Sequence, residues 1–165
     1  MRIAGLVQDS IVDGAGFRFV VFAQGCLRRC VGCHNPDSFD LDGGVEMPVD
    51  DVIREMLSNP LTDGLTLSGG EPFLQAADCA AIARAAIENG LNVWVYTGYT
   101  FEELLHEALT QPDYKELLEL TDVLIDGAFI MEERSLLLKW RGSKNQRIID
   151  VPNSLANSVV VELDV

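Results

Sequence analysis

Three of the four cysteines lie within eight residues, and their spacing suits a metal centre. Cys26, Cys30 and Cys33 are separated by three and by two residues, and neighbouring glycines favour a loop over a regular helix. A structural zinc normally needs four ligands, and the fourth would be His34, which is adjacent to Cys33, or the distant Cys79. A four-iron cluster held by three thiolates leaves one iron open for an exogenous ligand. The spacing favours the cluster, with zinc as the alternative.

A glycine-rich turn, Ser68-Gly69-Gly70-Glu71-Pro72, is the second segment that could do chemistry. Glycines without side chains let the backbone approach a ligand closely, and the glutamate can accept a charge-assisted hydrogen bond from an amino group. An ordinary turn between a strand and a helix would have the same composition. Two shorter polar turns, Thr97-Gly98 and Asp126-Gly127, follow later in the chain.

Each of these polar segments directly follows a predicted strand. Hydrophobic patterns predict strands at residues 17–23, 65–67, 92–96 and 122–125, and helices at 49–57, 79–87 and 101–109, the last with a capping box formed by Thr100 and Glu103. Weaker patterns predict helical segments at 114–120 and 131–140 and strands at 148–151 and 158–163. Since strands and helices alternate, we expect βαβ crossovers and a mainly parallel sheet.

The predicted fold class is α/β, a single domain over residues 1–165. An eight-fold barrel takes about 250 residues, so we expect a partial (β/α) barrel with roughly five parallel strands, open on one side. Such sheets place their chemistry beyond the carboxyl ends of the strands. The four polar segments should therefore converge on one face of the molecule.

Charge and hydropathy exclude several functional classes. The chain has 26 acidic and 12 basic residues, a net charge of −14, so binding to nucleic acid is not expected. The N-terminal residues contain no apolar run of signal-peptide length, and no stretch is long enough to cross a membrane. Clustered cysteines without a disulfide framework suit a reducing compartment, so we expect a cytoplasmic protein.

The cysteine motif and the glycine-rich turn together resemble the radical S-adenosylmethionine superfamily. CxxxCxxC after the first of these strands, followed one strand later by SGGEP, is the pattern that carries the resemblance. Within the superfamily, the chain is similar to the activating proteins of anaerobic ribonucleoside-triphosphate reductases. The segments that match are 12–16, 19–35, 94–99, 122–127 and 140–146.

This resemblance implies an oxidoreductase with a [4Fe-4S] cluster bound by Cys26, Cys30 and Cys33. The cluster would cleave S-adenosylmethionine reductively, and the 5'-deoxyadenosyl radical would generate a glycyl radical on the anaerobic ribonucleoside-triphosphate reductase. A reduced flavodoxin or ferredoxin is the implied electron donor. The implied contacts of S-adenosylmethionine, with His34 stacked on the adenine, are Gly32, Cys33, His34, Ser68, Gly69, Gly70, Glu71, Thr97 and Asp126.

Two alternative functions remain open from the sequence. One is a radical S-adenosylmethionine enzyme that acts on a small molecule or on another glycyl radical enzyme, and the other is a zinc-stabilised binding module without catalysis. We interpret Cys79 as a core residue, because it falls on the apolar stripe of its helix. Arg28 and Arg29, between the predicted ligands, are interpreted as part of a solvated loop face. The polar loop 141–147 is a candidate for the rim of the site or for a partner contact.

Overall fold

The computed structural model describes all 165 residues and contains one seven-stranded sheet. The strand order is β3-β1-β2-β4-β5-β6-β7, and the sheet is not closed. The strands are β1 (Arg2–Ser10), β2 (Arg18–Ala23), β3 (Val45–Glu46), β4 (Gly64–Gly69), β5 (Asn92–Tyr96), β6 (Val123–Asp126) and β7 (Arg147–Asp150). The helices are α1 (Val49–Leu57), α2 (Ala76–Glu88), α3 (Phe101–Ala108), α4 (Pro112–Glu119) and α5 (Val151–Asn157).

The centre of the sheet is parallel, as the alternation of strands and helices predicts, and its edges are not. Strands β2, β4, β5 and β6 are mutually parallel, whereas β1, β3 and β7 pair antiparallel with their neighbours. The parallel strands thus number four, where the sequence predicted roughly five. The difference is β7, since the chain returns from β6 through a loop without the crossover helix that a parallel connection needs.

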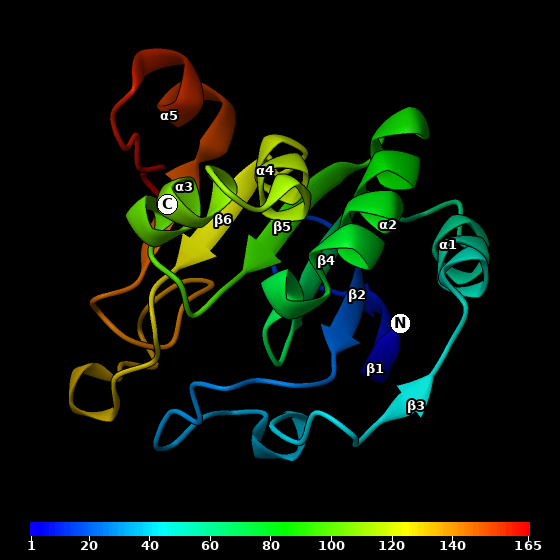
Figure 1. The fold of residues 1–165 in the computed structure, drawn as a ribbon, viewed down its shortest axis with the longest axis horizontal. Coiled ribbons are helices and arrows are strands. Elements are labelled where there is room, and N and C mark those ends of the chain that lie inside the picture. Colours follow the sequence, from blue (N-terminus) through cyan, green and yellow to red (C-terminus); the bar gives the residue numbers. More distant parts are fainter.

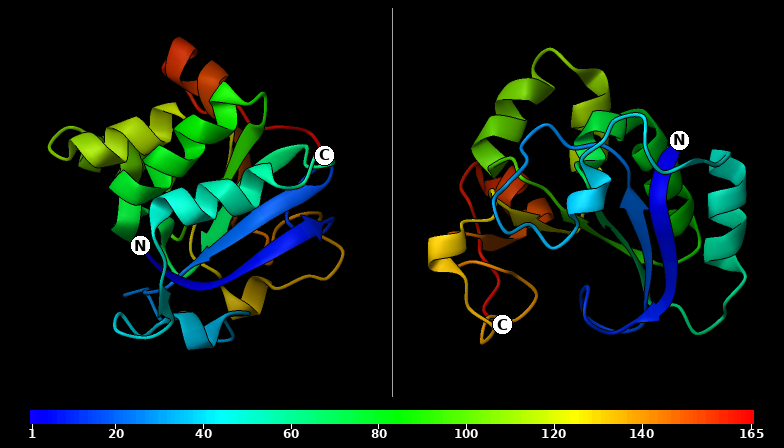
Figure 2. Two further views of the ribbon diagram at one scale, coloured as in Figure 1. Left: turned by 90° about the vertical axis from the view of Figure 1, so that its right-hand side faces the viewer. Right: turned by 90° about the horizontal axis from the view of Figure 1, so that it is seen from below.

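Helices cover one face of the sheet, and loops border the other (Figures 1 and 2). The main core consists of 24 buried residues and joins the helices to alternate positions of the strands, such as Leu65, Leu67, Val93 and Val95. The intervening positions face away from the helices, and there a second, smaller cluster contains Trp94, Val123, Ile125 and Ile148. Because successive side chains of a strand point to opposite faces of the sheet, the position of a residue in its strand decides which face its side chain reaches.

Most predicted elements are present with bounds close to those expected, including the capping box in front of α3. The prediction of a helix over residues 131–140 is wrong, because only a single 3-10 turn, Met131–Glu133, forms there. Leu136 and Leu137 are 83% and 96% exposed, so this segment buries no continuous apolar stripe of the kind that stabilises a helix.

Three further differences lie near the ends of the chain. Strands β1 and β3 were not predicted, since the pattern of β1 is mixed and β3 has only two residues. Helix α5 was also missed, although Asp150 caps it by accepting a hydrogen bond from the backbone N–H of Asn153 at 3.0 Å. The expected strand at 158–163 is reduced to one isolated bridge between Ile149 and Glu162. No helix combines the length and the apolar character needed to cross a bilayer.

Candidate functional site

The three clustered cysteines line one pocket at the carboxyl ends of the parallel strands. Their loop follows β2, and Gly25 at its start adopts a φ of +103°. The loop is anchored by two backbone hydrogen bonds, from Gly25 N–H to the carbonyl of Ser38 at 2.7 Å and from Cys26 N–H to that of Phe39 at 3.2 Å. All three thiols are half-buried, and burial raises the pKa of Cys26. The thiols therefore face a shared, partly enclosed space.

The arrangement of the thiols does not match a site for a single ion. No group of three or more His, Cys, Asp or Glu side chains lies close enough together to hold one metal ion. Cys26, Cys30 and Cys33 nevertheless border one shared pocket. The fourth cysteine, Cys79, is fully buried in the core, as the sequence predicted.

The glycine-rich turn after β4 packs directly on the cysteine loop. A Cβ on Gly70 would lie 2.3 Å from the carbonyl oxygen of Gly25, and one on Gly69, whose φ is +96°, would lie 2.5 Å from the backbone nitrogen of Ala23. These neighbours are backbone atoms, which cannot rotate away as a side chain can. The two glycines are thus needed to bring the end of β4 against the start of the cysteine loop.

Glu71 ties the ends of two parallel strands together inside the pocket wall. Its carboxylate accepts hydrogen bonds from the hydroxyl of Thr97 at 2.9 Å, the N–H of Gly98 at 2.8 Å and the N–H of Phe73 at 3.1 Å. The side chain is 3% exposed, and burial raises its pKa. The pocket lining contains six of the residues predicted to contact a cosubstrate, namely Cys33, Ser68, Gly69, Gly70, Glu71 and Thr97.

Strand alternation also brings residues to the pocket that the sequence analysis did not single out. Ser68, Tyr96 and Ile125 occupy positions that point away from the helices at the ends of β4, β5 and β6. Because side chains alternate between the two faces of a strand, the strand patterns of the sequence could have identified Tyr96 and Ile125 as facing the same side as Ser68. Arg28, Phe39 and Phe129 are further lining residues that were not predicted, whereas Gly98, Gly127 and Gln146 come from the polar turns and the loop that the sequence analysis placed near the site.

Arg28 is exposed, as expected for a solvated loop face, and it also lines the pocket, which the sequence did not predict. Its guanidinium carbon lies 4.8 Å from the centre of the Tyr99 ring, and its Nη2 is 3.3 Å from a carboxylate oxygen of Glu103. The aliphatic part packs on Gly98, where a Cβ would come 2.3 Å from Arg28 Cδ. Arg28 lies between Cys26 and Cys30 in the sequence, and its side chain extends to the residues that follow β5.

The residues flanking the third cysteine lie beside the segment that follows β6. The ring of His34 lies 5.5 Å from that of Phe129, centre to centre, and a Cβ on Gly32 would be 2.8 Å from the sulfur of Met131. His34 lines a second, neighbouring cavity with Phe22 and Gly69 and not the pocket of the thiols. Phe129, in contrast, lines the pocket of the thiols.

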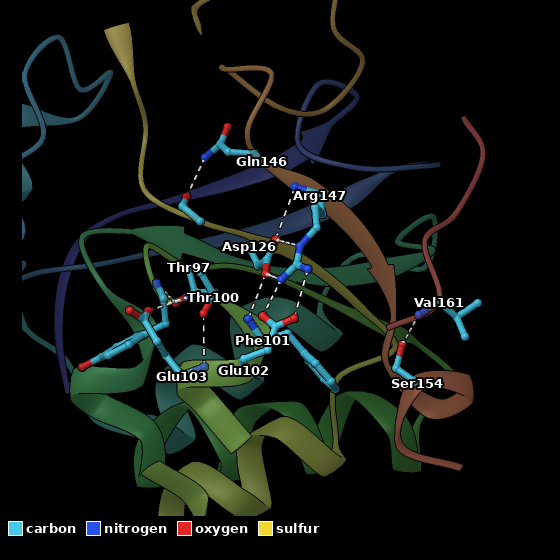
Figure 3. A network of polar contacts seen from close by, with 12 residues as sticks. Thr97, Thr100, Phe101, Glu102, Glu103, Asp126, Gln146, Arg147, Ser154 and Val161 are labelled. Carbon is cyan, nitrogen blue, oxygen red and sulfur yellow. Dashed lines mark hydrogen bonds and ion pairs between the residues drawn. The ribbon is translucent and has the colours of Figure 1, made fainter. Parts of the chain in front are cut away.

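Asp126 points toward the helices and is held in a polar network there (Figure 3). It shares a strand face with the core residue Leu124 and is 1% exposed, so its side chain does not line the pocket. Its carboxylate accepts hydrogen bonds from the N–H of Phe101 at 2.8 Å and from the guanidinium of Arg147 at 2.5 Å. Arg147 also pairs with Glu102 at 2.7 Å, and these two carboxylates raise the pKa of Arg147.

The network predicts a measurable stability loss when Arg147 is removed. Arg147→Gln leaves the buried Asp126 carboxylate without its cation, and we expect a loss of about 2–4 kcal/mol in the free energy of unfolding. Arg54→Gln is the matched control, because Arg54 is 73% exposed and pairs only with Asp51 on the surface of α1. The control should change stability by less than about 0.5 kcal/mol. Chemical denaturation measures both, and equal effects would contradict this role of Arg147.

Comparison with known proteins gives consistent matches over most of the chain. Residues 12–149 match the family described as 4Fe-4S single cluster domain. The anaerobic ribonucleoside-triphosphate reductase-activating protein of Haemophilus influenzae is 36% identical over 148 residues, 84% of this chain and 90% of the relative. That of Escherichia coli K12 is 31% identical over 146 residues, with 82% and 90% coverage. Pyruvate formate-lyase 1-activating enzyme of the same organism is 35% identical over 165 residues, 96% of this chain but 64% of the relative.

Proposed function

The chain belongs to the 4Fe-4S single cluster domain family, together with the activating proteins of anaerobic ribonucleoside-triphosphate reductase, and we propose that it generates the glycyl radical of such a reductase. The observation that carries the proposal is the pocket in which three thiols face the glycine-rich turn after β4. The relatives named as activators of this reductase, which match 84% and 82% of the chain, support the reductase as partner.

The donor set of the pocket fits the cofactors that this function requires. Cys26, Cys30 and Cys33 would hold the cluster, because their three thiols border one pocket and would leave one iron of a four-iron cluster open for the cosubstrate. When bound, the cluster supplies the electron that cleaves S-adenosylmethionine to methionine and the 5'-deoxyadenosyl radical.

The protein's own groups orient the cosubstrate and close the site around it. Ser68, Gly69 and Gly70 offer the backbone at the end of β4, and Glu71 places a buried carboxylate where an ammonium group can bind. Thr97 fixes the orientation of that carboxylate through its hydroxyl. Gly32 and His34 complete the proposed contacts on the other side of Cys33, with His34 near the adenine.

Asp126 is proposed to contribute indirectly, through the elements that border the cosubstrate. Its hydrogen bond to the N–H of Phe101 fixes the start of α3 beside β6. The adjacent Gly127 lines the pocket and donates its N–H to the carbonyl of Tyr99 at 2.8 Å. The carboxylate of Asp126 thereby holds the ends of β5 and β6 in register.

The shape of the sheet supports a protein substrate. We infer that residues 1–165 form a single domain in which the four parallel strands make an incomplete (β/α) barrel, whose open side admits a loop of the partner. Small-molecule enzymes gain from cavities that bury most of the ligand. A glycine suits the radical because its α-carbon carries no side chain, so the radical can flatten and delocalise into both adjacent amides. A reduced flavodoxin or ferredoxin in the cytoplasm is the proposed electron donor.

Isotope transfer from the reductase tests this function directly. We expect that reductase expressed with α-deuterated glycine transfers deuterium to 5'-deoxyadenosine when mixed anaerobically with this protein, S-adenosylmethionine and a reductant. An organic radical should appear on the reductase by electron paramagnetic resonance. Reductase labelled with β-deuterated alanine is the matched control and should transfer none. Formation of unlabelled 5'-deoxyadenosine without a radical on the reductase would disprove the function and favour a small-molecule substrate.

A further inference from the structure

A closed loop between β6 and β7 projects beside the pocket. We name residues 134–144 the basic loop. It is closed at its base by an antiparallel bridge between Arg134 and Ser143 and by the hydrogen bond from Lys144 N–H to the carbonyl of Glu133 at 3.0 Å. Near its end, the ring of Trp140 packs edge-on against Trp94 of β5, with 5.0 Å between the ring centres. The loop is therefore fixed to the sheet and presents a defined surface.

The tip of the basic loop is apolar and fully accessible. Leu136 and Leu137 are adjacent in sequence and are 83% and 96% exposed, the two most exposed large hydrophobic side chains of the chain. Single exposed apolar residues are common on protein surfaces, but an adjacent pair held on an anchored loop is typical of a contact site. Nothing in the chain itself covers this pair.

The charge of the basic loop is opposite to that of the rest of the protein. Arg134, Lys139, Arg141 and Lys144 are four of the 12 basic residues, and the eleven residues of the loop contain no acidic one, although the chain carries a net charge of −14. None of the four forms an ion pair. The loop is thus a local positive surface that can attract an acidic protein which the remaining surface would repel.

The position of the basic loop links this surface to the pocket. On its two sides in the sequence, Phe129 and Gln146 line the pocket with the thiols, and Met131 contacts the cysteine loop at Gly32. Figure 1 shows the segment in gold and orange leaving the carboxyl end of β6, below the sheet. A protein bound to the basic loop therefore lies next to the pocket.

We propose that the basic loop is the docking surface for the glycine-bearing domain of the reductase, which binds the leucine pair in an apolar recess flanked by carboxylates. This inference rests on the proposed function and adds the surface that recognises the partner. The location favours the glycine-bearing domain over the electron donor, because only the former has to insert a chain segment into the pocket. A bound partner at this place is held with its loop near the reacting groups.

The test compares variants of the loop with matched variants elsewhere. The double variant Leu136→Ser with Leu137→Ser removes the apolar tip, and Lys139→Gln with Lys144→Gln removes two charges. The controls are Leu109→Ser, since Leu109 is 80% exposed after α3, and Lys115→Gln on α4. Anaerobic biolayer interferometry measures the Kd of each reconstituted full-length protein for the reductase. We expect the leucine variant to bind about 10- to 100-fold more weakly and the controls to bind as the parent does.

Further readouts separate docking from chemistry and from folding. With dithionite as reductant, the leucine variant should bind S-adenosylmethionine with unchanged affinity but give a lower glycyl radical yield at limiting reductase. The lysine variant should lose most of the salt dependence of binding. Unchanged Kd for both loop variants would overturn the docking surface and leave the function intact, whereas failure of the parent protein to bind or activate the reductase would overturn the function. A defect seen only with flavodoxin or ferredoxin, and not with dithionite, would assign the loop to the electron donor and overturn the proposal.

Discussion

Single replacement of Cys26, Cys30 or Cys33 by alanine is expected to abolish cluster binding and with it all radical formation. In the proposed site each thiol is one of three protein ligands, and no other cysteine lines the pocket. His34, the residue next to Cys33, lines the neighbouring cavity and not the pocket of the thiols. Iron and sulfide analysis after anaerobic reconstitution, with the visible absorbance, should show about four irons in the parent and almost none in the variants.

Cys79→Ala is the matched control for the ligand variants. Cys79 is fully buried in α2 among core residues, and burial raises its pKa to about 12, so it is an inert core thiol. Its loss should lower stability by about 1 kcal/mol through the small cavity and leave the iron content unchanged. Retention of about four irons by Cys30→Ala, or loss of iron in Cys79→Ala alone, would refute the ligand assignment.

Gly70→Val is expected to disrupt the site through the backbone. A Cβ at this position would lie 2.3 Å from the carbonyl oxygen of Gly25 and 3.0 Å from that of Ser38, so the glycine-rich turn and the cysteine loop must separate. Overpacking of this kind costs about 1–3 kcal/mol in stability. A shift of about 1 Å in the groups that hold a ligand can cost ~100-fold, and we expect a loss of that order in affinity for S-adenosylmethionine.

Gly5→Val provides the same substitution where space is free. A Cβ on Gly5 of β1 would have no atom within 4 Å, and a β-branched residue suits a strand. Chemical denaturation and titration calorimetry on the reconstituted proteins measure both effects. Equal affinities for S-adenosylmethionine in the Gly70 and Gly5 variants would show that the close approach at Gly70 is not required.

The clustering of the three cysteines and the place of the pocket were predictable from the sequence, because both depend on local patterns. Buried strands such as Asn92–Tyr96 have a distinctive apolar run, and the capping box at Thr100 and Glu103 marks the start of α3 unambiguously. Parallel strands joined by right-handed crossovers must end on the same edge of a sheet. The convergence of the cysteine loop, the glycine-rich turn and Thr97 followed from that rule and is confirmed.

The direction of individual side chains at that edge was decided only by the tertiary structure. Asp126 faces the helices, where Arg147 and the N–H of Phe101 satisfy its carboxylate, and the guanidinium of Arg28 lies over the ring of Tyr99. Both depend on partners distant in sequence, so no local pattern specifies them. A strand-end residue has two faces available, and the choice is made by which face offers the buried charge a partner.

The structure also decided the course of residues 131–140. Their apolar content predicts a helix, but a helix in a folded protein is stabilised mainly by burying an apolar face against other elements. Here the leucine pair has no surface within the chain to pack on, and Trp140 is the side chain that finds one, on Trp94. The sequence therefore determined the cysteine loop, the strands and the edge at which they meet. Tertiary packing decided which side chains enter the pocket and which remain exposed, because both outcomes depend on contacts between residues far apart in the chain.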